Sequence, residues 1–191
     1  MIALTFDDGP DPEWTPLVLD ALARAGVRAT FFPLSPRVAA HPELIARIRA
    51  EGHGLGLHGW AHLKHPETDR DVVAADADRA LAAFGRAPAW WRLPYGLAAD
   101  FSAGLAADRG LRVAGWTHDT HDWRGDDAAS MRAALGRLGD GAVVLMHDAL
   151  GPGVRRAGCA ETVALTEKLL AEGHRSVPLD ELGAVPGGRP G

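Results

Sequence analysis

Residues 1–14 read MIALTFDDGPDPEW, and this stretch indicates how the chain is built. An apolar run at residues 2–6 has the composition of a buried strand and ends at two adjacent carboxylates, Asp7 and Asp8, before Gly9-Pro10. Two neighbouring carboxylates at the end of a buried strand repel each other and resist desolvation. The stretch therefore predicts a compensating positive charge, and with it a functional site, where the first strand ends.

Beyond this stretch, short apolar runs alternate with segments of helical spacing. Expected strands lie at residues 2–6, 28–33, 54–58, 89–92, 111–117, 142–147 and 175–177. Expected helices lie at residues 15–25, 42–51, 69–84, 101–109, 127–138 and 161–172. Repeated strand–helix–strand units imply right-handed crossovers and a parallel sheet. With seven strands, this α/β chain is predicted to close into a barrel or near-barrel, followed by a flexible Gly/Pro-rich tail at residues 184–191.

Composition excludes several classes of protein. A length of 191 residues suits one domain, and a formal charge of -5 argues against a nucleic-acid partner. No apolar run approaches the roughly 18 residues of a membrane segment. Cys159 is the only cysteine, which excludes an internal disulfide and a multi-thiolate metal site. Because the first strand begins at the N-terminus, the sequence as written predicts a cytoplasmic protein, or a secreted one if a leader was removed. The oligomeric state stays open, and a monomer is compatible with the sequence.

Residues that can coordinate, ionise or donate gather where the expected strands end. They are Asp7 and Asp8 after the first strand, His58 after the third, Arg92 after the fourth, Asp119 and Asp122 after the fifth and His147 after the sixth. In barrels of this kind the carboxyl ends of the strands share one rim, where catalytic residues collect. The loop at residues 149–153 is also expected there. The distribution predicts one active site on that rim.

The stretch GLGLHGWAHLKH at residues 54–65 suggests a metal site. His58 and His62 are four residues apart, so a helical turn would point both imidazoles the same way. This is the spacing of the H-E-x-x-H zinc motif, but Gly59 replaces the Glu, so a third ligand and a base must come from elsewhere. One carboxylate of the Asp7–Asp8 pair can be the ligand and the other the base. A site with three protein ligands and an open position is of the catalytic type.

Further residues complete a hydrolytic site. The turn at residues 92–96 can offer the backbone N–H of Tyr95 to an oxyanion. His147 is the best candidate for a general acid that protonates a leaving amine, with an aspartate oriented toward its other nitrogen. A divalent cation bound at the predicted ligands would activate water for the attack. These parts together predict amide hydrolysis.

Five stretches in order carry a resemblance to a known family. They are TFDDGP (5–10), HGWAH (58–62), RLPYG (92–96), DTHDW (119–123) and LMHD (145–148). They resemble the motifs of the polysaccharide deacetylase family, also called the NodB-homology family or carbohydrate esterase family four. The resemblance extends from residue 4 to about residue 182. It implies a distorted (β/α)7 TIM-like barrel, here residues 1–183, that removes acetyl groups from N-acetylated sugars with one divalent metal ion, zinc first and Co²⁺ or Ni²⁺ as alternatives.

The resemblance also implies a role for each matching residue. Asp7 would be the base, Asp8, His58 and His62 the metal ligands, Arg92 the partner of the base, Tyr95 the oxyanion donor and His147 the acid. Trp123 would stack on a sugar face, Leu145 would shape the pocket for the acetyl methyl group, and Asp119 or Asp122 would orient His147. Gly59 departs from the family, which usually has Ser or Thr there, so the metal loop is expected to be looser or braced by Trp60.

Alternative functions and substrates stay open at this point. A related amidase acting on a formamide or a cyclic imide would share the metal chemistry, and a non-catalytic sugar-binding module would need only the groove. Peptidoglycan, chitin, xylan and small N-acetyl glycosides are all candidate substrates.

Overall fold

The computed structural model describes residues 1–154 and 157–183 and contains seven parallel strands. They are β1 (Ala3–Asp8), β2 (Thr30–Pro33), β3 (Gly54–Leu55), β4 (Trp90–Trp91), β5 (Arg112–Val113), β6 (His118–Asp119) and β7 (Val143–His147). Five form one sheet in the order β3-β2-β1-β7-β6, and β4 pairs with β5. A bridge between Leu57 and Trp91 joins the two sheets. Because no ladder joins β5 to β6 in the described residues, the predicted (β/α)7 barrel is present in a distorted, partly open form.

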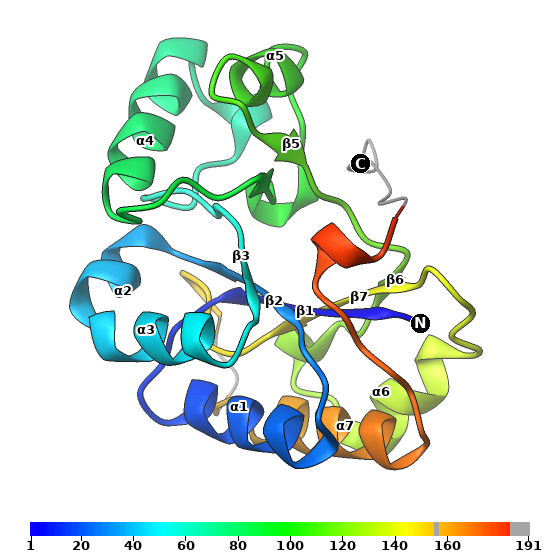
Figure 1. Cartoon of the computed structure of the whole chain (residues 1–191). Helices are drawn as coiled ribbons and strands as arrows, with labels where there is room; N and C mark the ends of the chain where they lie inside the picture. Colours follow the sequence, from blue (N-terminus) through cyan, green and yellow to red (C-terminus); the bar gives the residue numbers. More distant parts are fainter. Residues whose placement is uncertain (155–156, 184–191) are drawn as a thin grey trace.

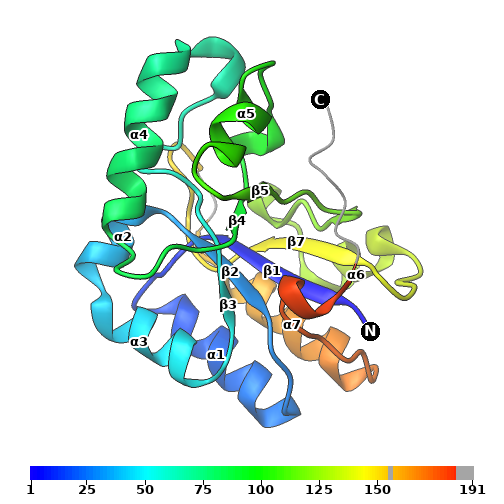
Figure 2. The ribbon, with the colours of Figure 1, turned by 45° about the horizontal axis from the view of Figure 1, so that its top comes forward.

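Helices pack against the outside of these strands (Figures 1 and 2). They are α1 (Trp14–Ala25), α2 (Ser35–Ala40), α3 (Pro42–Ala50), α4 (Arg70–Ala82), α5 (Ser102–Ala107), α6 (Ala128–Leu135) and α7 (Ala160–Ala171), with short 3-10 turns η1 (His65–Glu67), η2 (Pro94–Gly96), η3 (Asp122–Arg124) and η4 (Leu179–Glu181). In both views α1, α6 and α7 cover one side of the sheet, and α4 and α5 lie at the opposite end of the molecule. No helix in the described part of the chain is long and apolar enough to cross a membrane.

The central strand explains why the opening stretch decides the fold. All six residues of β1 are buried, since β2 and β7 flank it and side chains pack on both of its faces. Phe6 stacks on Phe31 of β2 with ring centroids 5.1 Å apart. Leu19 and Leu22 of α1 are also fully buried in this core, and each such side chain contributes about 1.5–3 kcal/mol. The packing fixes the end of β1, and therefore the place of Asp7 and Asp8.

Two predicted strands are wrong. The segment 111–117 is not one strand, because the chain leaves β4 after Val113 and joins β7 near Thr117, whose backbone N–H and hydroxyl both donate to the Val143 carbonyl. The segment 175–177 forms only one bridge, between Ser176 and Ile2, at the start of β1. In both cases long-range backbone hydrogen bonds decide the outcome, and local composition does not encode them.

Other boundaries differ less. The strand expected at 54–58 is regular only at β3, and α2 was not predicted, because its six residues, with Pro36 second, carry little periodicity. The expected helices at 69–84, 101–109 and 127–138 are present but shorter. The tail predicted at residues 184–191 lies outside the described residues, so its flexibility and the boundary at residue 183 stay predictions.

Candidate active site

Three predicted ligands converge at the end of the barrel. Nε2 of His58 and Nε2 of His62 each lie 3.5 Å from Oδ1 of Asp8. One ligand atom from each residue lies within 4.8 Å of the other two. Nδ1–H of His58 donates to the Arg92 carbonyl at 2.8 Å, which turns Nε2 toward Asp8. The two histidines lie close together, as their spacing predicted. They are on a loop, however, and not on the helical turn that we predicted.

The electrostatics of these groups suit a cation. Burial opposes ionisation of Asp8, but contact with His58 and the charges of His58, His147 and His62 hold the pKa of its carboxyl at about 2. Burial, helped by the charge of His58, lowers the pKa of His62 to about 4. At neutral pH this leaves an anionic oxygen on Asp8 and a neutral imidazole on His62, whereas at His58 burial opposes protonation but the charges of Asp7 and Asp8 raise the pKa. Oδ1 of Asp8 is buried and has no hydrogen-bond partner in the described part of the chain, so these residues fit a divalent metal ion.

Asp7 is held differently, although it adjoins Asp8. Its Oδ1 accepts a hydrogen bond from Nη1 of Arg92 at 3.0 Å, and its Oδ2 lies 3.9 Å from Nε2 of His58. Consecutive strand residues normally point to opposite faces. Asp8 leaves that pattern with a φ of 73°, and both side chains line one cavity. The backbone turn at Asp8 therefore brings two carboxylates to the same site, one beside an arginine and one beside two imidazoles.

Arg92 is a fully buried cation whose two Nη groups reach three acceptors, whereas its Nε has no hydrogen-bond partner in the described part of the chain. Nη1 also donates to Oγ1 of Thr5 at 2.6 Å, and Nη2 donates to the Gly115 carbonyl at 3.0 Å. The guanidinium lies 4.3 Å above the Phe32 ring. Burial lowers the pKa of Arg92, and the charge of Asp7 opposes that shift. The arginine supplies the positive charge expected beside Asp7.

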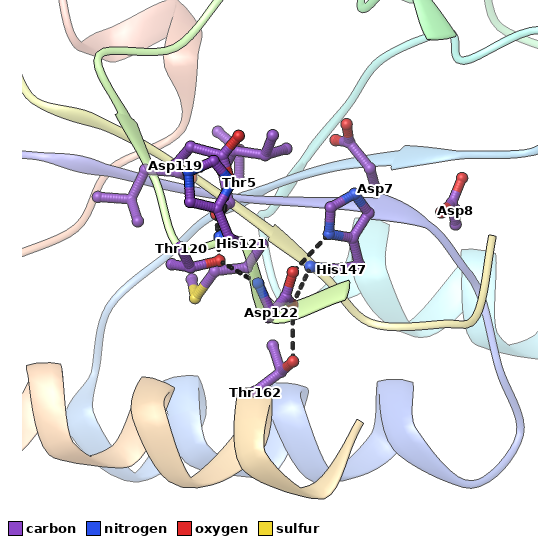
Figure 3. A network of polar contacts seen from close by, with 12 residues as sticks. Thr5, Asp7, Asp8, Asp119, Thr120, His121, Asp122, His147 and Thr162 are labelled. Atoms are coloured by element: carbon purple, nitrogen blue, oxygen red, sulfur yellow. Dashed lines mark hydrogen bonds and ion pairs between the residues drawn. The ribbon is translucent and has the colours of Figure 1, made fainter. Parts of the chain in front are cut away.

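His147 and Asp122 form the second ion pair (Figure 3). Nδ1–H of His147 donates to Oδ1 of Asp122 at 2.7 Å, and the His147 backbone N–H donates to Oδ2 at 2.9 Å. The Thr162 hydroxyl, from α7, donates to the same Oδ2 at 2.7 Å. Burial opposes protonation of His147, but the charge and hydrogen bond of Asp122, with the charge of Asp8, raise its pKa to about 9. At neutral pH His147 carries a proton.

The two aspartates between which sequence could not choose have different surroundings. Asp122 is buried and contacts His147. Oδ1 of Asp119 accepts the backbone N–H of His121 at 2.8 Å, and its side chain lies at the cavity wall. The left-handed backbone of His121, with a φ of 51°, separates their directions. The geometry therefore assigns the contact with His147 to Asp122 and leaves Asp119 as a wall residue.

The three predicted ligands line one cavity of about 330 Å³ together with Asp7, Asp119 and His147. Its apolar wall consists of Leu93, Tyr95, Gly96, Trp116, Trp123, Leu145, Ala149, Pro152 and Val154. Tyr95 and Trp123 are exposed by 49% and 44%, while Leu145 is buried. The Tyr95 ring lies 4.4 Å from that of His62, and the Tyr95 backbone has a φ of 59°. The predicted Tyr95, Trp123 and Leu145 thus share a wall with the ligands.

Sequence reasoning missed Trp116 and Thr162, and it placed Gly151 only as part of the loop expected at residues 149–153. Trp116 lines the cavity and packs over Gly96, where an added Cβ would lie 2.3 Å from the indole ring. Gly151 approaches Asp8 so closely that a Cβ there would lie 2.4 Å from Oδ2. Thr162 supports Asp122 from a helix. Trp116 could have been noticed as an aromatic residue close before the DTHDW motif. Nothing in the sequence around Thr162 indicates that it contacts the site.

The loop after Gly59, which was expected to be looser than in the family or braced by Trp60, is held by contacts with α4. The carboxylate of Asp76, on α4, accepts the backbone N–H groups of Trp60 and Ala61, each at 2.9 Å. The Arg79 guanidinium lies 3.8 Å above the Trp60 ring. The expectation that Trp60 braces the loop is met in this form, with α4 as its support.

A model of the family described as polysaccharide deacetylase matches residues 1–114. The chain belongs to this family. It is 37% identical over 186 residues to peptidoglycan-N-acetylglucosamine deacetylase PgdA of Listeria monocytogenes, covering 95% of this chain but only 38% of that protein's length. It is 36% identical to a chitooligosaccharide deacetylase of Bradyrhizobium sp. (strain ANU 289), covering 89% of this chain and 80% of the relative.

A solved family structure is similar in fold. The Bc1960 peptidoglycan N-acetylglucosamine deacetylase, in complex with 4-naphthalen-1-yl-N-oxidanyl-benzamide, matches with a TM-score of 0.86 and 30% identity. The match covers 98% of this chain and 90% of that one. The family predicted from the five motifs is therefore confirmed, and the family resemblance extends over both the sequence and the fold.

Proposed function

We propose that this chain is a metal-dependent carbohydrate N-deacetylase that hydrolyses the acetamide of N-acetylated amino sugars in an oligo- or polysaccharide. The observation that carries the proposal is the convergence of Asp8, His58 and His62 in one cavity with two differently paired groups, Asp7 and His147. Relatives named as peptidoglycan and chitooligosaccharide deacetylases support the substrate class.

Asp8, His58 and His62 would hold one divalent cation, with zinc first and Co²⁺ or Ni²⁺ as alternatives, because two imidazoles and a carboxylate suit these ions. When bound, the ion supplies a Lewis acid that polarises the amide carbonyl and makes water more acidic. The His58–Arg92 hydrogen bond orients one ligand before the ion arrives.

Asp7 would act as the general base. Arg92 binds its Oδ1, so the carboxylate cannot rotate freely, and Oδ2 remains directed toward His58. A base must lie within hydrogen-bond reach of the proton that it removes, and Asp7 lines the cavity beside the proposed ligands. Arg92 thus orients the base and neutralises its charge in the resting site.

His147 would act as the general acid. Its pKa of about 9 keeps Nε2 protonated at neutral pH, while Nδ1 is bound to Asp122. Asp122 orients the ring and stabilises its positive charge. After attack, the amine leaves with the proton from Nε2, and the backbone N–H of Tyr95 would stabilise the oxyanion.

The apolar wall favours an acetyl group on a sugar. Leu145 is buried at the base of the cavity and provides a methyl-sized apolar contact, and the exposed face of Trp123 can stack on a pyranose ring. A formamide would leave the contact at Leu145 unused. A sugar-binding module would not require Asp7 and His147 to be paired as they are.

Acetate release from N-acetylglucosamine oligomers of several lengths tests the proposal. The chain would be assayed as purified, after chelation and after add-back of Zn²⁺ or Co²⁺, beside N-formyl oligomers. We expect chelation to stop release, add-back to restore it and the acetyl substrate to be preferred. Sugar binding without turnover in the metal-loaded chain would favour the binding module, and preference for the formyl substrate would favour the other amidase.

A further inference from the structure

The two histidine ligands are oriented by different means. Nδ1 of His58 is bound to the Arg92 carbonyl. Nδ1 of His62 is buried and has no hydrogen-bond partner in the described ranges 1–154 and 157–183. Metal-ligating histidines are normally oriented by a partner on the second ring nitrogen. The direction of the His62 ring must therefore depend on its backbone and on ring contacts with His58 and Tyr95.

The backbone from Gly59 to His62 has an unfavourable conformation. Gly59 has a φ of 97° and His62 a φ of 54°, so the segment between the ligands begins and ends in the left-handed region. For a residue other than glycine this conformation costs about 1–2 kcal/mol. It persists only where surrounding contacts impose it.

Asp76 makes the contacts that impose it. Its Oδ2 accepts the N–H of Trp60 and its Oδ1 accepts the N–H of Ala61, each at 2.9 Å, so one carboxylate binds both residues inside the segment. An added Cβ at Gly59 would lie 3.1 Å from Oδ2, so glycine leaves room for this approach. Charge-assisted bonds from a carboxylate to backbone N–H groups are stronger than neutral ones.

The carboxylate is itself on a rigid element. Asp76 is half-buried on α4, a helix anchored in the core by Val73, Ala77 and Ala80. Arg79, one turn further along, lies 3.8 Å above the Trp60 ring. The helix therefore contacts both the backbone and the side chain of the segment.

We infer that Asp76 is a positioning residue that sets the affinity of the metal site by fixing the backbone on which His62 is presented. The inference rests on the proposed function, because it requires His62 to be a ligand. Asp76 touches neither ligand ring through a hydrogen bond, so it acts through the loop. Outer contacts of this kind typically change metal affinity about 10–100-fold.

Co²⁺ titration of the metal-free chain, followed by visible absorption and by competition with a chelator, tests the inference. The variants are Asp76→Asn and, as a matched control, Asp78→Asn, which removes the same charge from the same helix and breaks a pair with Arg109 instead. We expect Asp76→Asn to weaken Co²⁺ binding at least about tenfold and to alter the Co²⁺ spectrum, and Asp78→Asn to do neither.

The other outcomes overturn it in distinguishable ways. Unchanged affinity and spectrum in folded Asp76→Asn, or equal losses in both variants, would refute the inference alone. A wild-type chain that binds no Co²⁺ would refute the metal site and the inference with it. If Asp76→Asn does not fold, hydrogen exchange of the wild-type chain decides: slow exchange at the Trp60 and Ala61 amides supports the inference, and unprotected exchange of both refutes it.

Discussion

The two ion pairs of the site, Asp7–Arg92 and His147–Asp122, each join an aspartate to a cation, but the group proposed to react is different in each. On the base side, the group proposed to react is the carboxylate, and a buried arginine holds it at 3.0 Å. On the acid side, the group proposed to react is the cation, and a buried carboxylate holds it at 2.7 Å. The comparison shows that one cavity can hold a carboxylate against a fixed cation and a histidine against a fixed carboxylate.

The pairs differ in how they are supported. Arg92 is surrounded by acceptors from the barrel itself, including Thr5 on β1. Asp122 lies in a turn after β6 and depends on Thr162 of α7, outside the barrel. The base side is therefore part of the core, whereas the acid side is assembled from a loop and a helix. Each side can therefore be weakened separately by substitutions that leave the other side unchanged.

The largest effect is expected on the base side. Asp7→Asn retains an oxygen that can accept from Arg92 but cannot take a proton from water. We expect kcat/KM to fall by about 10³–10⁴-fold at saturating metal, in line with the upper range for general base catalysis. Steady-state acetate release with metal analysis of the same sample checks this. Loss of activity accompanied by loss of metal would instead make Asp7 a ligand.

A smaller loss is expected on the acid side. Asp122→Asn removes the charge that raises the pKa of His147, so the histidine loses its proton at lower pH. We expect kcat to fall by about 10²-fold at neutral pH, and the alkaline limb of the pH–rate profile to move to lower pH. An alkaline limb at its wild-type position would contradict the assignment of His147 as the acid.

The same pair should govern the stability of the metal-free chain. The pKa of His147 is raised from 6.5 to about 9, so its contribution is fully present below pH 6.5 and is lost as the pH rises toward 9. It amounts to about 3 kcal/mol of unfolding free energy, in order of magnitude. Urea unfolding between pH 6 and 9.5 should show this decline in the wild type and a weaker one in Asp122→Asn. Parallel curves for the two proteins would contradict the prediction.

The smallest effects are expected from the two threonine hydroxyls that support the ion pairs, Thr162 on the acid side and Thr5 on the base side. Thr162→Val removes the donor to Asp122, and we expect kcat to fall about threefold, because the carboxylate that orients His147 is then held less firmly. Thr5→Val removes an acceptor of Arg92, and we expect a loss of about 1–3 kcal/mol of stability without a shift of the alkaline limb of the pH–rate profile. Thermal unfolding and pH profiles of both variants check this. A shift of the profile in Thr5→Val would show that the two sides are coupled.

The base side was the more predictable of the two from sequence. β1 is a continuous run of buried residues that ends at Asp7 and Asp8. These two residues are therefore expected at the rim whichever strands flank β1. The choice between Asp119 and Asp122 could not be made, because it depends on the left-handed turn at His121 and on hydrogen bonds to β7 and α7. Periodicity records neither of these.

The same limit applies to the fold and to the metal loop. Alternation of strands and helices predicted the barrel, but the break between β5 and β6 follows from long-range contacts of Thr117 and Gly115. The spacing of His58 and His62 predicted that they meet. It gave no sign of Asp76, which lies 14 residues beyond His62 and acts on backbone groups.

Metal content tests the central claim most directly. Wild type, His58→Ala and a control, His174→Ala, would be reconstituted with Zn²⁺, desalted and analysed for bound metal. His174 follows α7 and does not line the cavity. We expect one ion per chain in the wild type and in His174→Ala, and almost none in folded His58→Ala. Full metal occupancy in His58→Ala would contradict it.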